Sequence, residues 1–203
     1  MTSSTPAGMQ RPGGRTARVR AAVLRAAEDA LVEVGFAGFD LGDVARRAEV
    51  GRTTVYRRWG TVGALLADVL TGMAEQSLPR ARTGSLHEDL RANARLVRRT
   101  LADPRQGALF RAVLVAAAGD PAAAEALHRF YRVRVAEWAP CVTEAVERGE
   151  VPAGTDPEEV VRAVSAPLYY RMLTTAEPLD EAAADRAAAA AEAAARAGAF
   201  RAG

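Results

Sequence analysis

The residues best suited to contact a charged or polar partner are concentrated in one short stretch, Val50 to Gly60, which reads VGRTTVYRRWG. It holds three arginines, two threonines and a tyrosine. An arginine guanidinium can form two bonds to a guanine edge, and a threonine methyl can touch the methyl of thymine. Hydroxyl and guanidinium groups also bind phosphate oxygens. The stretch therefore has the chemistry needed to contact nucleic acid, although composition alone leaves a solvated basic surface equally open.

Helical spacing divides this stretch into two faces. At about 100° per residue, Val55 and Trp59 share one side, while Thr53 and Arg57 lie on the other. A short helix expected at 41–48 precedes it across a tight turn. Two such helices form a helix-turn-helix, whose second helix enters the major groove of DNA. We therefore expect the two apolar residues to be buried and the polar ones to be exposed.

The sequence contains no arrangement of residues typical of an enzyme or of a metal site. It has no glycine-rich phosphate loop and no Gly-x-Ser-x-Gly elbow. Its two histidines, His87 and His128, and its single cysteine, Cys141, do not have the spacing of metal ligands. We expect no catalytic residue, no metal and no cofactor. A helical module that binds an acidic protein partner stays open beside nucleic-acid binding.

Charge is unevenly distributed along the 203 residues. Residues 1–60 contain 10 arginines and 6 acidic residues, a net charge of +4, whereas the remainder contains 17 and 19, a net charge of −2. A basic N-terminal third indicates an anionic partner. Residues 1–15 are expected to form a flexible basic arm. With one cysteine, no signal peptide and no membrane span, a cytoplasmic protein is expected.

The elements that must position these residues are all predicted to be helices. Apolar residues recur at helical spacing, and no alternating strand pattern is visible. Asp40 and Thr61 can cap helix N-termini, and so can the aspartates of three Asp-Pro pairs, Asp103, Asp120 and Asp156. The expected helices cover residues 17–34, 41–48, 52–59, 62–76, 86–102, 105–117, 121–148, 157–175 and 180–200.

Residues from about Thr16 to Leu70 resemble the DNA-binding domain of the TetR (tetracycline-repressor-like) family of bacterial regulators. The shared features are Gly35-Phe36, Asp40, Asp43-Val44-Ala45, Glu49-Val50-Gly51 and Thr54-Val55-Tyr56-Arg57-Arg58-Trp59. The resemblance implies an all-α protein. It implies a helix-turn-helix DNA-binding domain at 16–61 and a larger C-terminal helical domain, for ligand binding and dimerisation, at 62–203.

The resemblance also implies which side chains contact DNA. The implied set is Arg52, Thr53, Thr54, Tyr56, Arg57, Arg58 and Thr61. Within it, Arg52, Thr53 and Arg57 are implied to face bases. The side chains of Thr54, Tyr56 and Arg58 are implied to face mainly phosphates.

Two positions depart from the family pattern. Glu49 occupies the place of the usual turn glycine, so it must take a left-handed backbone at a cost of about 1 kcal/mol or shift the turn. Val62 occupies the place of a lysine that contacts phosphate in many members, so one phosphate anchor is absent. Arg11, Arg15 and Arg18 are candidates to replace it, although a solvated tail is equally open.

For the C-terminal half, the resemblance implies a homodimer, a pocket and a mechanism. The last two long helices, expected within 157–176 and 180–201, would pair between subunits. A small hydrophobic effector would bind among Phe110, Leu114, Leu127, Tyr131, Val135, Trp138, Tyr169 and Met172. The spacing of those at 127–138 is more typical of a plain core than of a pocket. The implied protein is a dimeric repressor that a small molecule releases from a pseudo-palindromic operator; the alternative is a helical interaction module without an effector.

Overall fold

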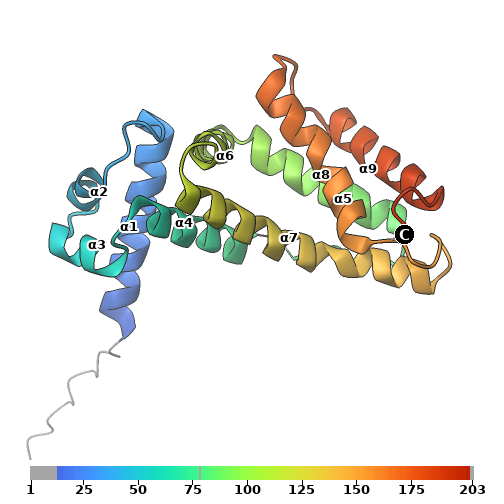
Figure 1. The fold of residues 1–203 in the computed structure, drawn as a ribbon, viewed down its shortest axis with the longest axis horizontal. Helices are drawn as coiled ribbons and strands as arrows, with labels where there is room; N and C mark the ends of the chain where they lie inside the picture. Colours follow the sequence, from blue (N-terminus) through green and yellow to red (C-terminus); the bar gives the residue numbers. More distant parts are fainter. Residues whose placement is uncertain (1–12, 78, 202–203) are drawn as a thin grey trace, which may run out of the picture.

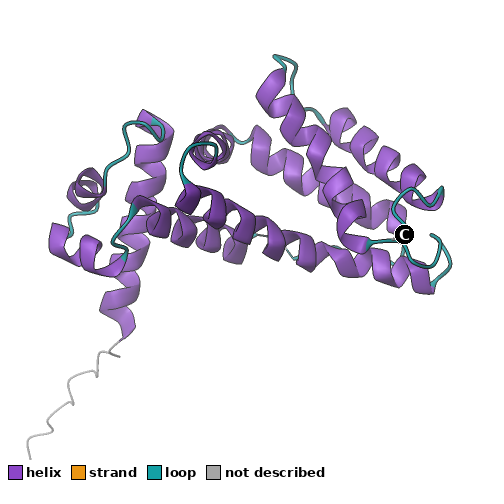
Figure 2. Cartoon of the chain, in the orientation of Figure 1, coloured by secondary structure: helices purple, strands orange, loops and turns teal. Residues whose placement is uncertain are grey.

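All regular elements are helices in the part of the chain that the computed structural model describes, residues 13–77 and 79–201 (Figures 1 and 2). The expected all-α class is confirmed. None of the described helices is both long enough and apolar enough to cross a membrane. The helices are α1 (Gly13–Val34), α2 (Leu41–Arg47), α3 (Arg52–Arg58), α4 (Val62–Gln76), α5 (Leu86–Ala102), α6 (Pro104–Ala117), α7 (Pro121–Glu147), α8 (Pro157–Thr174) and α9 (Glu181–Arg196).

Side-chain caps begin the helices at the positions that the sequence predicts. Asp40 Oδ2 accepts a hydrogen bond from the Asp43 N–H at 2.9 Å, and Thr61 Oγ1 accepts one from the Ala64 N–H at 3.2 Å. The aspartates of the three Asp-Pro pairs cap α6, α7 and α8, each with proline in the first turn. These caps satisfy N–H groups that have no partner within the helix.

Two helix ends differ from the expected ones. α1 begins at Gly13 rather than at residue 17, so residues 13–15 are helical and are not part of an arm. α9 ends at Arg196 rather than at residue 200, because Gly198 has a φ of 78° and the backbone there leaves the helical region. The remainder of the predicted arm, residues 1–12, lies outside the described residues.

Two hydrophobic clusters hold the helices together. The first joins α1, α2, α3 and α4 to α6 and the beginning of α7, and the second joins α5, α7, α8 and α9. α4 packs along α7, and α9 packs against both α5 and α8. In Figure 1, α2 and α3 lie at one end of the molecule and α8 and α9 at the other. The first cluster includes residues of α4, α6 and α7, which lie beyond residue 61. The domain boundary predicted between residues 61 and 62 therefore stays a prediction.

Candidate functional site

α3 is held in place by its two apolar residues. Val55 is fully buried and Trp59 is 7% exposed, as its spacing predicts. The Trp59 indole N–H donates to Asp68 Oδ2 of α4 at 3.0 Å, and Arg20 of α1 donates to the other carboxylate oxygen at 2.6 Å. Burial opposes ionisation of Asp68, but these hydrogen bonds outweigh it and hold its pKa below the ordinary value. α1 and α4 therefore fix the orientation of α3 through one shared carboxylate.

The opposite side of α3 is exposed and polar. The structure places all of the predicted DNA-contacting side chains of α3 on this helix surface, with Thr54 half-buried; the exposed ones are Arg52, Thr53, Tyr56, Arg57 and Arg58. Thr61 is also exposed, but it lies at the beginning of α4, where its hydroxyl oxygen caps the helix. Its hydroxyl can still donate one hydrogen bond and accept one more.

Arg52 turns back from α3 over the first turn of α2. Its guanidinium lies 5.8 Å from the centre of the Tyr56 ring. A Cβ built on Gly42 would lie 2.7 Å from Arg52 Nη2, so Gly42 is the residue that leaves room for this guanidinium. The pKa of Arg52 is raised mainly by its interaction with Tyr56 and more weakly by the charge of Asp40. The sequence showed that position 42 has no side chain; the structure shows that Arg52 occupies the resulting space.

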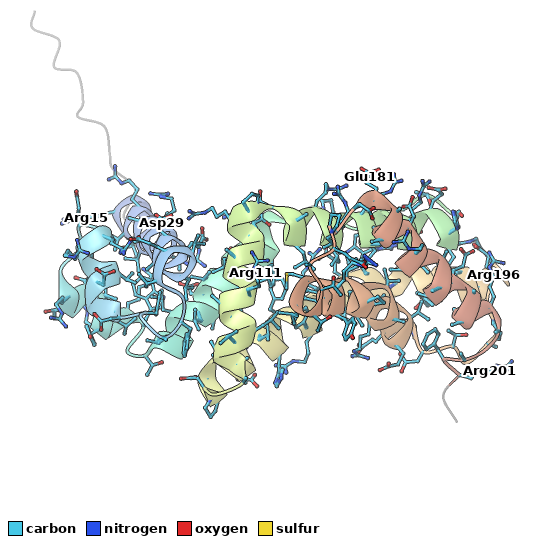
Figure 3. All side chains as sticks on the ribbon, turned by 90° about the horizontal axis from the view of Figure 1, so that it is seen from above. Arg15, Asp29, Arg111, Glu181, Arg196 and Arg201 are labelled. Atoms are coloured by element: carbon cyan, nitrogen blue, oxygen red, sulfur yellow. The ribbon has the colours of Figure 1, made fainter. Side chains whose placement is uncertain are left out.

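The turn that presents α3 contains a strained residue. Glu49 has a φ of 54°, so the left-handed of the two conformations expected for it is the one present. Its neighbours form a basic hollow between α1 and α3, lined by Arg15, Thr16, Val19, Glu49, Val50, Gly51, Thr54, Arg57 and Arg58. Figure 3 shows Arg15 at this end of the molecule. Arg18 is exposed on α1 but does not line the hollow, and Arg11 lies outside the described residues.

A cavity of about 650 Å³ lies among α5, α6, α7 and α8, and its rim reaches α1 and α4. This volume is in the range of small-molecule sites. Five of the eight residues predicted to line an effector pocket line this cavity: Phe110, Tyr131, Val135, Trp138 and Tyr169. They come from three consecutive helices, α6, α7 and α8, and the packing of these helices brings them together.

The other three predicted pocket residues lie elsewhere. Leu127 is 6% exposed in the first hydrophobic cluster, because the beginning of α7 packs on α4 rather than beside the cavity. Leu114 packs against the same cluster, and Met172 packs against the second one. Leu114, Leu127 and Met172 therefore do not line the cavity, and their side chains contribute to the hydrophobic core instead.

Several lining residues were not identified from the sequence, among them Asn93, Arg105, Phe130 and Arg134. Asn93 carried the clearest available signal. It lies three residues after Leu90, on the apolar side of α5, and a buried polar residue in such a stripe is unusual. The arginines gave no such signal, since arginines occur throughout the chain.

Four aromatic rings in the cavity wall contact one another in edge-to-face or tilted pairs. The ring centres of Phe130 and Tyr131 are 5.4 Å apart, those of Tyr131 and Tyr169 5.5 Å, and those of Phe110 and Phe130 5.5 Å. Burial raises the pKa of Tyr169 to about 12 and raises that of Tyr131 further still. Both phenols are therefore neutral at physiological pH.

Arg105 links the cavity to the N-terminal helices. It lines the cavity from α6, and its guanidinium pairs with Glu28, at 3.3 Å, and with Asp29, both on α1. Glu28 lines the same cavity. One ion-pair cluster therefore connects the wall of the cavity to the helix that orients α3 through Arg20.

The outward sides of α8 and α9, here called the outer face, expose apolar side chains beside charged ones such as Arg162 and Arg186. On α8, Tyr170 is 68% exposed and Leu173 is 51% exposed, and Ala166 is exposed one turn earlier. On α9, the outward residues include Ala182, Ala189 and Ala193. Figure 3 shows Glu181 and Arg196 at the two ends of α9, at the opposite end of the molecule from Arg15.

Among the residues described, no group of three or more His, Cys, Asp or Glu side chains could hold a metal ion. The lone thiol, Cys141, is buried between helices, and burial raises its pKa to about 12. This thiol is therefore protonated at physiological pH and is not a reactive nucleophile.

Comparison with known proteins gives a consistent result along the chain. A family described as "Bacterial regulatory proteins, tetR family" matches residues 23–69, and one described as "Tetracyclin repressor-like, C-terminal domain" matches residues 80–191. The HTH-type transcriptional regulator AqdR of Rhodococcus erythropolis is 34% identical over 152 residues, which cover 75% of this chain and 73% of that protein.

Solved structures share the fold. The TetR family transcription regulator SCO0332 is 28% identical, with a TM-score of 0.68 over 87% of this chain and 97% of that one. MexZ of Pseudomonas aeruginosa, described as a key repressor responsible for antibiotic resistance, is 21% identical, with a TM-score of 0.64 over 88% of this chain and 95% of that one. At that identity the second likeness concerns the fold alone.

Proposed function

Because this chain belongs to the TetR family of bacterial transcriptional regulators, we propose that it is a repressor that binds a two-fold symmetric operator as a homodimer and leaves it when a small molecule binds. The observation that carries the proposal is the two-faced α3. Its apolar side is anchored to α1 and α4, and its arginine, threonine and tyrosine side chains face solvent.

In this proposal α3 enters the major groove of the operator. Thr53 and Arg57 contact base edges, and Thr54, Tyr56 and Arg58 contact phosphates. Arg52, which in the free protein lies over Gly42, contacts a base from the edge of α3. The basic hollow supports phosphate binding beside α3, because it holds three arginines and one glutamate.

One α3 helix covers too few base pairs to specify an operator, so a second copy is needed. The outer face supports a homodimer through α8 and α9, since large exposed apolar side chains mark association surfaces. A two-fold axis between the α8–α9 pairs would place two α3 helices at the ends of the dimer. Operator half-sites would then lie roughly 34 Å apart or at a multiple of that spacing. The protein would act in the cytoplasm, where its operator lies.

The cavity supports release by a small molecule. Arg105 and Glu28 line it and belong to the ion-pair cluster between α6 and α1. A ligand that displaces α6 would change how α1 sits on the C-terminal helices, and with it the separation of the two α3 helices. Such a ligand releases DNA only if it binds the DNA-free arrangement more tightly than the DNA-bound one. MexZ, with the same fold, is described as a repressor, which is consistent with this direction of control.

The proposal is tested by selecting bound sequences from a random duplex library and footprinting the product. We expect a pseudo-palindrome with two protected half-sites. Affinity should fall with rising salt, because bound arginines release counterions from phosphates. Binding with no sequence preference, or binding to a single half-site by a monomer, would overturn the proposal in favour of a general basic interaction surface.

A further inference from the structure

Two buried polar groups in the cavity wall lack a partner. Asn93 of α5 is 4% exposed and Trp138 of α7 is 3% exposed, and both line the cavity. Neither Asn93 Oδ1 nor Trp138 Nε1 has a hydrogen-bond partner among the described residues. Buried acceptors and donors are nearly always paired, because leaving one unpaired costs free energy. Both atoms are covered by neighbouring protein atoms, so a molecule bound in the cavity gains affinity from them where it shifts these neighbours and supplies a donor to the first and an acceptor to the second.

The rest of the wall determines the shape of that molecule. Phe110, Phe130, Tyr131 and Tyr169 contribute aromatic rings that already meet edge to face, apart from the tilted Phe110–Phe130 pair. The ring centres of Phe110 and Tyr169 are 6.2 Å apart. Aromatic rings favour further offset-stacked or edge-to-face partners. A planar ring system therefore fits this wall better than a flexible aliphatic chain.

The interior carries little uncompensated charge. Arg134 pairs with Glu137, and Arg105 pairs with Glu28 and Asp29. Both tyrosine hydroxyls are neutral, because burial raises their pKa values. Arg99 lines the cavity at an exposed position, where water screens its charge. An anionic ligand would lose hydration on entry and find its cationic neighbours already paired or at the rim.

We propose that the effector of this cavity is an uncharged planar aromatic molecule whose rim donates a hydrogen bond to Asn93 Oδ1 and accepts one from Trp138 Nε1. A hydroxylated fused-ring compound has this chemistry. The inference rests on the proposed function for its regulatory meaning, but ligand binding itself is measured without DNA.

Calorimetry with three probes tests the proposal: naphthol, naphthalene and the naphthoate anion. Naphthol carries the required hydroxyl, naphthalene has the same ring without it, and naphthoate adds a charge. We expect naphthol to bind at least about 10-fold more tightly than naphthoate. Asn93→Leu, which keeps the branched shape of the side chain but removes the acceptor, should weaken the binding of naphthol about 5- to 10-fold and leave that of naphthalene unchanged.

Ser165→Ala is the matched control. Ser165 lines the same cavity, but its hydroxyl already bonds the Arg162 carbonyl at 3.2 Å, so its removal should not change the affinity for naphthol. If Asn93→Leu fails to fold, the comparison of the three probes on the unaltered protein decides. Three results would overturn the proposal. They are tighter binding of naphthoate than of naphthol, an equal loss of affinity for naphthol and naphthalene in Asn93→Leu, and no binding of any probe at millimolar concentration.

A gel-shift assay with operator DNA separates this inference from the proposed function. Binding of naphthol that depends on Asn93 supports the ligand class, even if the DNA complex persists. Persistence of that complex at saturating naphthol would instead count against release by a ligand in this cavity.

Discussion

At the scale of single residues, the presentation of α3 depends on two positions beside it. Gly42 leaves the space that the Arg52 guanidinium occupies, and Glu49 makes the turn with a left-handed backbone. Neither residue is on α3, yet each constrains which side chains face a DNA partner and at what angle. Substitutions at Arg57 test direct contact with DNA bases, whereas substitutions at Glu49 test how the turn orients α3.

Replacing Arg57 with alanine tests direct base contact. If Arg57 bonds guanine, the substitution should cost about 1–3 kcal/mol of binding and relax specificity at one base position. Binding to a set of operators that vary at each position measures this. Arg111→Ala removes an exposed arginine from α6 and is the charge-matched control. A uniform loss across all sequences would mark Arg57 as a phosphate contact instead.

Replacing Glu49 separates backbone strain from charge. Glu49→Gly should raise the free energy of unfolding by up to about 1 kcal/mol, because glycine adopts a positive φ without steric cost. Glu49→Gln removes only the charge and should leave stability unchanged. Both variants should bind DNA more tightly, because each removes the carboxylate from the basic hollow. Urea unfolding and gel shifts measure the two effects; equal stabilisation by both variants would refute the strain argument.

At the scale of helices, two contacts join distant parts of the chain. α4 approaches α7 so closely that a Cβ on Gly63 would overlap the Cβ of Ala122. α5 and α9 are joined by Asp185, which pairs with Arg91 at 3.1 Å and with Arg95 at 2.9 Å. The first contact is steric and the second is electrostatic, so each responds to a different change.

Gly63→Ala should push α4 away from α7 and lower the free energy of unfolding by about 1–3 kcal/mol. Adding Ala122→Gly should recover part of this loss, since the two Cβ atoms compete for the same space. Gly72→Ala is the control within the same helix. A Cβ there would lie 3.7 Å from Leu24 Cδ1, an ordinary contact, so this change should stabilise α4 by roughly 0.5–1 kcal/mol. Urea unfolding measures all four proteins.

Asp185 gives the α5–α9 contact a dependence on pH. Hydrogen bonds from Arg95 and Arg91 hold the pKa of Asp185 well below its ordinary value. Because the folded-state pKa is lower than the unfolded one, its contribution is present above about pH 4 and is lost as the pH falls further. The difference in urea midpoint between the unaltered protein and Asp185→Asn should therefore be constant from about pH 5 to 8 and shrink below about pH 4. An equal difference at all pH values would contradict this.

At the scale of the whole molecule, α3 lies at one end and α8 and α9 at the other (Figure 1), and residues of α5, α6, α7 and α8 line the cavity. In the proposed dimer, this arrangement would let one event in the cavity affect the distance between two copies of α3. The proposed mechanism depends on association of two subunits, because an isolated subunit has no second α3 to separate.

Tyr170→Arg places a charge on the outer face and should convert the dimer to a monomer with much weaker operator binding. Val115 on α6 is exposed to the same degree, 69% against 68% for Tyr170, so Val115→Arg is a matched control that should remain dimeric. Analytical ultracentrifugation at micromolar concentration measures both. A dimer that survives Tyr170→Arg would place the association surface elsewhere.

The sequence by itself determined the helices, their caps and the two faces of α3, because each depends on residues within about four positions. The tertiary structure decided what no local pattern encodes. It placed Leu127 in the core and Asn93 in the cavity wall, although both lie on apolar stripes. It also set Arg52 over Gly42. The physical reason is that helix crossing angles, rather than spacing along one helix, decide which part of an apolar face meets a neighbour and which part lines a space.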